Sequence, residues 1–326
     1  MALFGRRKKG GGHGSEAQLI VAAIGAVPPL TEADMGWLVE RWVAGMRAGG
    51  VTIRNVDSDG SLTGSNGRDY YLDNLAQTLA QLPRNEWEEA VAGAVRSSLV
   101  PFVKEGSLGP EELARSLYPR VTPLDSFTPE MMARADWYGP AVAPGLALRA
   151  CLDTPESVQQ VFSAKTLAPL GGWDAVYPRL LENLRALRPA PAHTLSQVDG
   201  ALEGIHSWES HLDDYFGATR VLLLDELLAE VGCAPGPAGT LVSMPTRHSL
   251  MVHVLRDRQS LLKCLGAMVR VTPRLYGEGP GPVSPFVYHR PGPEFPWQQL
   301  NERAEDGRMA VMVRGRFAES LAELDP

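Results

Sequence analysis

The segment 203–214 holds the densest group of residues that could bind a metal ion or move a proton. His206 and His211 lie in it, and Asp213 and Asp214 follow directly. A zinc-binding helix of the metalloprotease type needs two histidines four residues apart around a glutamate. The wider spacing found here places the two histidines on different faces of a helix, so a polar loop or strand edge is the favoured interpretation. A metal site that uses the two aspartates stays open.

His248 and His253 form a second histidine pair, in a segment whose residues alternate. Their odd spacing places them on opposite faces of a strand, so they cannot share one ion without distortion. A structural histidine with satisfied hydrogen bonds is the favoured interpretation of each. We therefore predict no metal ion and no other cofactor for this chain.

The three cysteines, Cys151, Cys233 and Cys264, are an odd number without C-x-x-C spacing. This pattern predicts neither a disulfide framework nor a zinc site. Cys264 falls inside a predicted helix, whereas Cys233 lies in a loop of glycine and proline where the sequence places no base beside it. The sequence also lacks a nucleophile elbow, a Walker A motif and a dinucleotide fingerprint. No catalytic residues are therefore predicted.

A short segment around Asp57 resembles the first half of a calcium-binding loop. Asn55, Asp57 and Asp59 supply oxygens at alternate positions, and Gly60 follows at the sixth. The twelfth position is Asn66 instead of a bidentate glutamate, and the flanking residues have the pattern of strands. A hairpin turn of aspartate and glycine is therefore the favoured interpretation.

Helical periodicity and capping signals predict a helical N-terminal part. Thr31 has the position of a helix N-cap, with Asp34 as a weak capping-box partner, and Gly49 ends that helix. Further helices are predicted over residues 15–27 and 86–99.

Strand-like and helical segments follow one another along the rest of the chain. Strands are predicted over residues 51–56, 145–152, 157–163, 211–220, 240–244, 249–255 and 283–289. Helices are predicted over residues 173–187, 222–231 and 257–276. This order predicts an α+β fold, with antiparallel sheets built from strand–strand–helix units, helices on one face, and a helical N-terminal part.

The length of 326 residues is sufficient for two domains of ordinary composition, with 44% hydrophobic and 21% charged residues. The proline-rich stretch 126–144 predicts a linker between an N-terminal α/β subdomain over residues 15–125 and a C-terminal α+β subdomain over residues 145–300. Residues 1–14 are predicted to be a disordered basic tail, and residues 301–326 a C-terminal extension.

The charge of the chain is unevenly distributed. The formal net charge is −7, yet Arg6, Arg7, Lys8 and Lys9 form a basic cluster near the start. An acidic body does not attract a phosphate backbone, so we predict no nucleic-acid partner. No apolar run approaches the length of a membrane span, and the basic cluster supports at most a transient contact with a membrane surface. A cytoplasmic location is the expectation.

Several short motifs recur in a set order along the chain. They are YLDNL at 71–75, LYPR at 117–120, LENL at 181–184, MPTRHSL at 244–250, YGEGP at 276–280 and VSP at 283–285. In this order they resemble the YtpQ-like family of bacterial proteins of unknown function, over about residues 50–300. The chain departs from the family pattern in two places. It has His248 where the family often has an acidic residue, and it has the basic N-terminal tail. The resemblance implies the fold and the cytoplasmic location, and no activity.

The segment 244–250 is the best candidate for a binding site. Pro245 cannot donate to a ladder and should stand at a strand end, so Arg247 and His248 should project from the turn of a hairpin. We expect Arg247, His248 and Glu278 to form a polar surface, with Tyr276 beside it.

Trp297 follows a proline in a late loop and is a second candidate for an exposed contact. On the strand after the turn, Leu250, Val252 and Val254 should share one face. Because all three are aliphatic, we expect that face to pack on the helix over residues 257–276.

The favoured function is a non-catalytic cytoplasmic protein-binding protein, such as a toxin-neutralising (immunity) protein or a regulatory adaptor. Its partner is expected to be another protein. One alternative is an enzyme of unknown reaction whose site is built from loops, with Arg247, His248, Tyr276 and Glu278 as the first candidates. The other alternative is a transient membrane-surface adaptor that uses Arg6, Arg7, Lys8 and Lys9.

Overall fold

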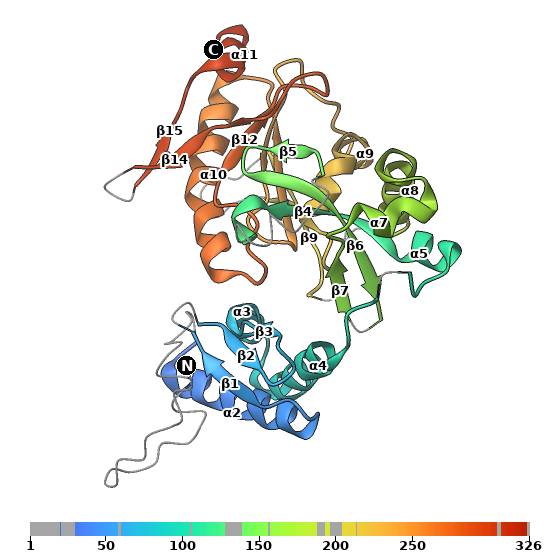
Figure 1. Cartoon of the computed structure of the whole chain (residues 1–326). Helices are drawn as coiled ribbons and strands as arrows, with labels where there is room; N and C mark the ends of the chain where they lie inside the picture. Colours follow the sequence, from blue (N-terminus) through green and yellow to red (C-terminus); the bar gives the residue numbers. More distant parts are fainter. Residues whose placement is uncertain are drawn as a thin grey trace. The chain divides into compact units, whose positions relative to one another are not determined.

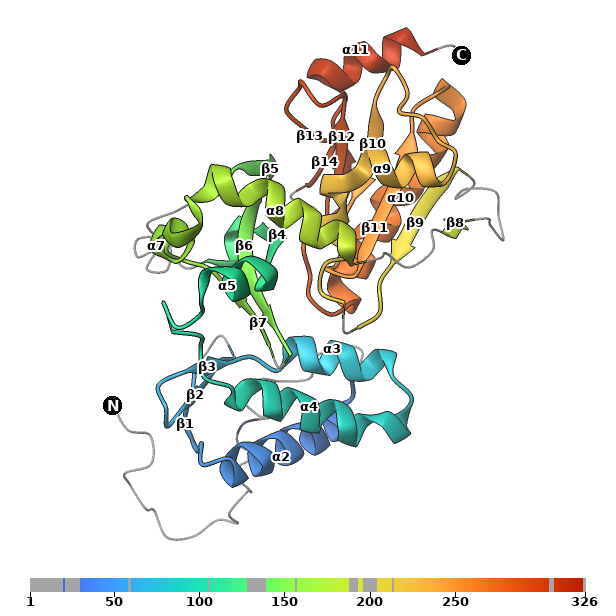
Figure 2. The ribbon, with the colours of Figure 1, turned by 90° about the vertical axis from the view of Figure 1, so that its right-hand side faces the viewer.

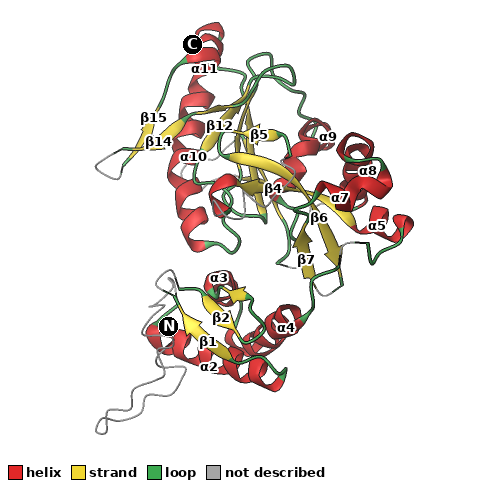
Figure 3. Ribbon diagram, viewed as in Figure 1, coloured by secondary structure: helices red, strands yellow, loops and turns green. Residues whose placement is uncertain are grey.

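A computed structural model of the chain divides the described residues into two compact units (Figure 1). The residues that the structure describes are 20, 30–57, 60–104, 106–127, 139–155, 157–187, 193–195, 204–212, 214–304 and 308–324. The N-terminal unit ends at Phe102 and also contains Glu278–Pro280, and the C-terminal unit takes the remaining residues. Both units combine helices with antiparallel strands, so the predicted α+β class is confirmed (Figure 3).

The N-terminal unit packs helices against a small antiparallel sheet. Its helices are α2 (Glu32–Ala48), α3 (Asp73–Gln81), α4 (Trp87–Leu99) and the 3-10 turn η1 (Arg84–Glu86). Its strands are β1 (Ile53–Val56), β2 (Leu62–Gly64) and β3 (Asp69–Tyr70), paired in that order.

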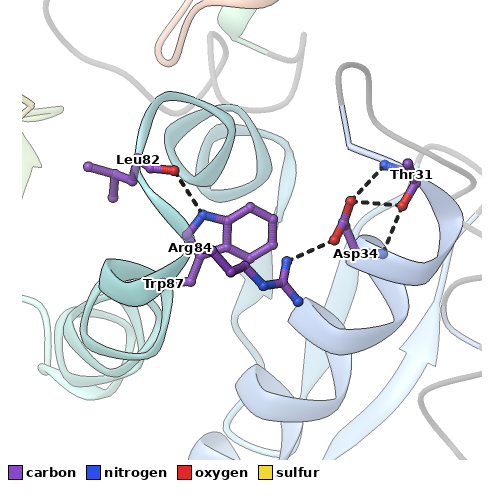
Figure 4. Close-up of polar contacts among 5 residues, drawn as sticks. All are labelled: Thr31, Asp34, Leu82, Arg84 and Trp87. Carbon is purple, nitrogen blue, oxygen red and sulfur yellow. Dashed lines mark hydrogen bonds and ion pairs between the residues drawn. The ribbon is translucent and has the colours of Figure 1, made fainter.

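Helix α2 begins at a complete capping box. The Thr31 hydroxyl accepts a hydrogen bond from the Asp34 amide at 3.2 Å, and the Thr31 amide donates to Asp34 Oδ2 at 3.3 Å (Figure 4). The predicted N-cap is therefore confirmed, and aspartate serves in place of the usual glutamate as its partner. The helix ends at Gly49, also as predicted.

The core of the N-terminal unit follows from the spacing of large residues along α2. Met35, Leu38, Trp42 and Met46 recur every three or four positions and are fully buried. The Trp42 ring meets Tyr70 edge-on with centroids 5.4 Å apart, so the apolar face of the helix covers the sheet.

The C-terminal unit contains two larger sheets. The four-stranded sheet consists of β4 (Leu117–Pro123), β5 (Ala141–Ala143), β6 (Leu146–Thr154) and β7 (Ser157–Gln160). β6 pairs with all three of the others, and β4 lies at an edge. The helical segments that precede, connect or follow these strands along the chain are α5 (Pro110–Ser116), η2 (Leu124–Ser126), α7 (Ala164–Leu167), η3 (Ala168–Leu170) and α8 (Trp173–Ala186).

The six-stranded sheet has the order β13-β12-β10-β11-β9-β8. Its strands are β8 (His193–Leu195), β9 (Ile205–Glu209), β10 (Thr240–Ser243), β11 (Ser249–Val254), β12 (Val287–Arg290) and β13 (Gln298–Gln299). The predicted hairpin of β10 and β11 is confirmed, with Val242 opposite Val252. The helical segments of this region are η4 (Ala218–Leu223), α9 (Leu224–Glu230) and α10 (Arg258–Glu278).

Both faces of the central hairpin are covered, and the prediction of which residues meet the long helix is wrong. Leu250, Val252 and Val254 share a core with residues of α9 and η4, whereas Met251 and Leu255 pack with α10. Figure 2 shows α9 and α10 on opposite sides of this hairpin. Because a strand buried on both faces has no polar side, its alternation could not identify the face that meets one helix.

The strand predicted over residues 211–220 is wrong. The strand is β9, which ends at Glu209, and the chain then turns into η4. The Asp214 carboxylate accepts a hydrogen bond from the Phe216 amide at 2.9 Å, which closes a turn of the Asx type. Gly217 follows it, and a Cβ there would lie 2.6 Å from the His248 carbonyl oxygen, so only glycine fits.

The division between the units differs from the predicted linker. Strand β4 pairs along its whole length with β6, which joins residues 117–123 to the C-terminal unit. Strand β5 within the proline-rich stretch also pairs with β6. The boundary between the units, after Phe102, therefore precedes the proline-rich stretch that was predicted to be the linker.

The two ends of the chain differ in what the structure describes. The predicted basic tail and the helix over residues 15–27 lie outside the described residues, apart from Ile20, which is buried in the N-terminal core. The predicted C-terminal extension contains β14 (Asn301–Arg303), β15 (Met309–Val311) and α11 (Gly315–Glu323). Phe317 of α11 is fully buried in the core beside α10, so this segment belongs to the folded C-terminal unit.

Candidate functional site

Arg247 occupies the turn between β10 and β11, where its backbone is held from two sides. Its amide donates to the Gly281 carbonyl at 2.8 Å, and its carbonyl accepts from the Ala218 amide at 2.9 Å. Gly281 has a φ of +67°, and a Cβ at that position would lie 2.5 Å from Arg247 Cδ. The glycine therefore provides the space along which the arginine side chain extends.

The Arg247 guanidinium is oriented by an aromatic ring and by a histidine. Its Cζ lies 4.3 Å from the centroid of the Tyr215 ring, and its Nε donates to His248 Nε2 at 2.9 Å. Because arginine is only a donor, His248 Nε2 must be the acceptor. The proton of the neutral ring is then on Nδ1, which donates to the Asp214 carbonyl oxygen at 3.0 Å.

His248 is 5% exposed, so it does not project from the surface as the sequence suggested. Burial, followed by the neighbouring Arg247 charge, lowers its pKa to about 4. The ring is therefore neutral at pH 7, and both of its nitrogens are engaged. His248 fixes the direction of Arg247 rather than serving as a base.

Arg247 keeps its charge in a poorly solvated position. Burial lowers its pKa to about 10, the neighbouring Tyr215 acts in the opposite direction, and the positive charge of Arg120 adds a smaller decrease. Among the described residues, no carboxylate lies within ion-pair distance of the Arg247 guanidinium. A desolvated charge beside another of the same sign is unfavourable until an anion compensates it.

Arg120 and Arg149 extend the positive region onto the four-stranded sheet. They are direct partners on β4 and β6, so their side chains share one face of the sheet. Arg149 is only 1% exposed, and its Cζ lies 4.7 Å from the Phe127 ring centroid. The two strands therefore place a second guanidinium on the same face of the sheet as Arg120.

The two carboxylates that the structure describes in this region, Asp214 and Asp153, are not paired with Arg247. Asp214 pairs with the buried Arg220, with 2.7 Å between Oδ2 and Nη2. Asp153 lies on the same face of β6 as Arg149, and burial together with the nearby Asp214 charge raises its pKa. The arrangement therefore offers oriented guanidinium groups to an anion, which is the chemistry of phosphate and carboxylate recognition.

The residues that the sequence proposed for this site belong to different parts of the structure. Glu278 is exposed and belongs to the N-terminal unit, whereas Arg247 and His248 belong to the C-terminal unit. Tyr276 is partly buried in α10, and burial together with the Asp125 charge raises the pKa of its hydroxyl. Trp297 is also partly buried, with its ring 6.4 Å from that of Tyr288. Arg247 and His248 are in direct contact within the C-terminal unit.

The structure favours a hairpin at the segment that resembles a calcium loop. Strands β1 and β2 pair antiparallel across it, and the Asn55 side chain donates its amide to Asp57 Oδ1 at 2.6 Å. Asn55 thus presents a donor where a cation needs an oxygen, and Asp59 lies outside the described residues. In the part of the chain that the structure describes, no three acidic, histidine or cysteine residues gather to hold a metal.

The histidine pair of segment 203–214 is separated, and one member has an unexpected neighbour. His206 lies in β9, whereas the exposed His211 follows the strand. His206 Nε2 lies 3.2 Å from Cys233 Sγ, so the structure places a base beside this cysteine that the sequence did not indicate. The contact joins residues that are 27 positions apart, and no local pattern in the sequence indicates it.

The basic residues Arg6, Arg7, Lys8 and Lys9 lie outside the described residues. The helices that are described include none with the length and apolar character needed to cross a bilayer.

Comparison of the chain with protein-family models, curated proteins and solved structures gives no match. The resemblance to the YtpQ-like family therefore stays a prediction.

Proposed function

We propose that this chain is a non-catalytic binding protein whose partner presents a phosphate or carboxylate group to Arg247 and Arg120. The observation that carries the proposal is the arrangement of these two guanidinium groups. They lie close enough for one to lower the pKa of the other, and no described carboxylate pairs with Arg247. An anionic ligand would reduce the repulsion between the two guanidinium groups and would also give Arg247 an ion-pair partner.

The surroundings of Arg247 support binding rather than catalysis. Tyr215, His248 and Gly281 hold the side chain in one direction before a ligand arrives, which reduces the ordering cost of binding. His248 uses both ring nitrogens in hydrogen bonds, so it offers no free base for proton transfer.

The sequence-based expectations fit this proposal at a coarser level. A protein partner, as expected from the sequence, would supply the anion as an acidic or phosphorylated side chain. The immunity or adaptor role and the cytoplasmic location stay predictions. The same holds for the membrane-surface alternative, because its basic residues lie outside the described chain.

The test measures anion binding with inorganic phosphate and pyrophosphate as probes, by calorimetry and by the shift of the melting temperature. Pyrophosphate should bind the wild-type chain, and Arg247→Gln and Arg120→Gln should each weaken binding at least about tenfold, since a charged hydrogen bond contributes about 1.5–3 kcal/mol. Arg179→Gln is the matched control, because that arginine is half exposed and pairs with Glu182 on a helix surface.

The proposal fails if no anion binds, or if Arg179→Gln weakens binding as much as Arg247→Gln. Phosphorylated and acidic peptides then identify which anion a protein partner presents.

A further inference from the structure

The contact between Cys233 and His206 is built on rigid elements of the C-terminal unit. Helix α9 ends in a Schellman motif in which the Gly232 amide donates to Ala229 and the Cys233 amide donates to Leu228, at 3.1 and 2.8 Å. Gly232 has the left-handed φ of +69° that this motif requires. The helix end therefore fixes the position of the Cys233 backbone.

His206 is fixed just as firmly from the other side. It is the second residue of β9, which has a strand on each side, and it lies opposite Val252 of β11 and Thr194 of β8. The imidazole and the thiol are thus presented by a strand interior and a helix cap, which hold a pair of groups more accurately than loops do. The distance of 3.2 Å between Nε2 and Sγ is within hydrogen-bonding range for sulfur.

The position of the histidine allows it to accept the thiol proton, because Nε2 lies 3.2 Å from Cys233 Sγ. Burial lowers the pKa of His206, which keeps the ring unprotonated but makes it a weaker base, so the proton transfer depends on this short distance. A neutral imidazole beside a thiol is the nucleophile–base arrangement that generates thiolate in many enzymes and redox proteins. Both side chains are partly exposed, so a reagent in solution can reach them.

The other two cysteines lack these properties. Cys151 and Cys264 are fully buried, and burial raises the pKa of Cys151 to about 12. None of the three cysteines, all of which the structure describes, is part of a disulfide. The chain therefore contains one accessible thiol with a base and two buried thiols that serve as internal references.

We infer that Cys233 is a site of reversible thiol modification, activated by His206, which reacts with low-molecular-weight disulfides. The Cys233 proton moves to His206 Nε2, and the thiolate attacks one sulfur of the disulfide. The old S–S bond breaks as a new one forms to Cys233, and the departing thiolate takes the proton back from the imidazolium. The exchange conserves the number of disulfide bonds, so it needs no oxidant besides the disulfide itself.

The experiment follows adduct formation on the native, full-length chain with oxidised glutathione as the probe, by mass spectrometry of the peptides. One adduct should form, on Cys233, while Cys151 and Cys264 react only after denaturation. His206→Gln should slow the native reaction at pH 7 by about tenfold or more. His211→Gln, which changes an exposed histidine in the same segment, should leave the rate unchanged.

The pH profile separates activation from a general disturbance of the fold. In the wild type, the rate should level off toward neutral pH, and in His206→Gln it should keep rising up to the pKa of an isolated thiol. Melting curves of both variants check that they fold. The inference is overturned if Cys151 or Cys264 reacts in the native chain as fast as Cys233. It is also overturned if folded His206→Gln reacts at the wild-type rate or if the native wild type forms no Cys233 adduct.

Discussion

Arg84 in the N-terminal unit and Arg247 in the C-terminal unit both stack on aromatic rings, but only Arg84 has a carboxylate partner among the described residues. The Cζ of Arg84 lies 3.8 Å from the Trp87 ring centroid and 4.8 Å from that of Trp37. Its Nη1 also pairs with Asp34 Oδ1 at 2.8 Å (Figure 4). Arg247 has the ring of Tyr215 but no described carboxylate.

The difference shows how the same side chain can serve a fold or a ligand. Arg84 is half exposed and compensated, and it ties the capping box of α2 to the start of α4. Arg247 is desolvated and lies near another guanidinium. An arginine that the fold leaves without an opposite charge is a better candidate for ligand binding than one whose partners are all internal.

The largest effect is expected from a third arginine, which is both buried and paired. Arg220 is 2% exposed and forms an ion pair with Asp214. Arg220→Ala should lower the free energy of unfolding of the C-terminal unit by about 3–5 kcal/mol, because it leaves a partly buried carboxylate without its partner. Denaturant titration measures this loss. Arg185→Ala, which breaks an exposed pair with Glu226, should cost under about 1 kcal/mol. Equal losses of unfolding free energy in the two variants would contradict the distinction between a buried and an exposed ion pair.

A second prediction concerns the pH dependence of stability, which should differ between the two units. The described part of the N-terminal unit contains no histidine, whereas the C-terminal unit contains His248. The folded pKa of His248 is about 4, below the ordinary value of 6.5. The unfolded state therefore binds the proton first as the pH falls, and stability is lost between pH 6.5 and 4, by about 3 kcal/mol over the whole window. His206, His253 and His289 shift in the same direction.

Denaturant titrations between pH 7 and 4 check this slope. His248→Gln should make it shallower, and hydrogen exchange corrected for pH should place the loss in β10 and β11 rather than in α2. Asp153 opposes the trend, because its raised pKa favours the folded state at low pH. A slope unchanged by His248→Gln would show that this histidine is not the titrating group.

A third prediction uses two glycines with similar backbone angles. Gly281→Ala should cost about 1–3 kcal/mol through its positive φ and should also weaken pyrophosphate binding, since the new Cβ displaces the Arg247 side chain. Gly67→Ala in the N-terminal unit imposes a similar φ of +77° but meets no atom within 4 Å. It should therefore lower stability without changing pyrophosphate affinity, and an equal loss of affinity would count against the role of Gly281.

The smallest stability effects are expected from the two arginines compared above. Arg84→Gln should lower the free energy of unfolding by about 1 kcal/mol, through a half-exposed ion pair and its ring contacts. Arg247→Gln should change it by less, because the lost hydrogen bond to His248 is offset by the removal of a repelling charge. Denaturant titration checks both changes, and a loss above about 3 kcal/mol in Arg247→Gln would identify a structural role instead.

Local signals in the sequence were sufficient for much of the fold. The cap at Thr31, the stop at Gly49 and the hairpin around Pro245 depend on neighbouring residues, and the structure has all three. Strand β4 was missed because Pro119 and Pro123 argue against a strand. The prolines are tolerated because β4 is an edge strand that pairs only with β6.

The sequence by itself determined helix α2 and the hairpin of β10 and β11, and it singled out Arg247 and His248 in the turn of that hairpin. Capping and turn chemistry act over a few residues, so they can be read from the chain directly. Only the tertiary structure decided that Arg120 approaches Arg247 and that Cys233 meets His206. Those contacts join separate strands and helix ends, and they form because burial of the surrounding apolar side chains outweighs the cost of bringing distant segments together.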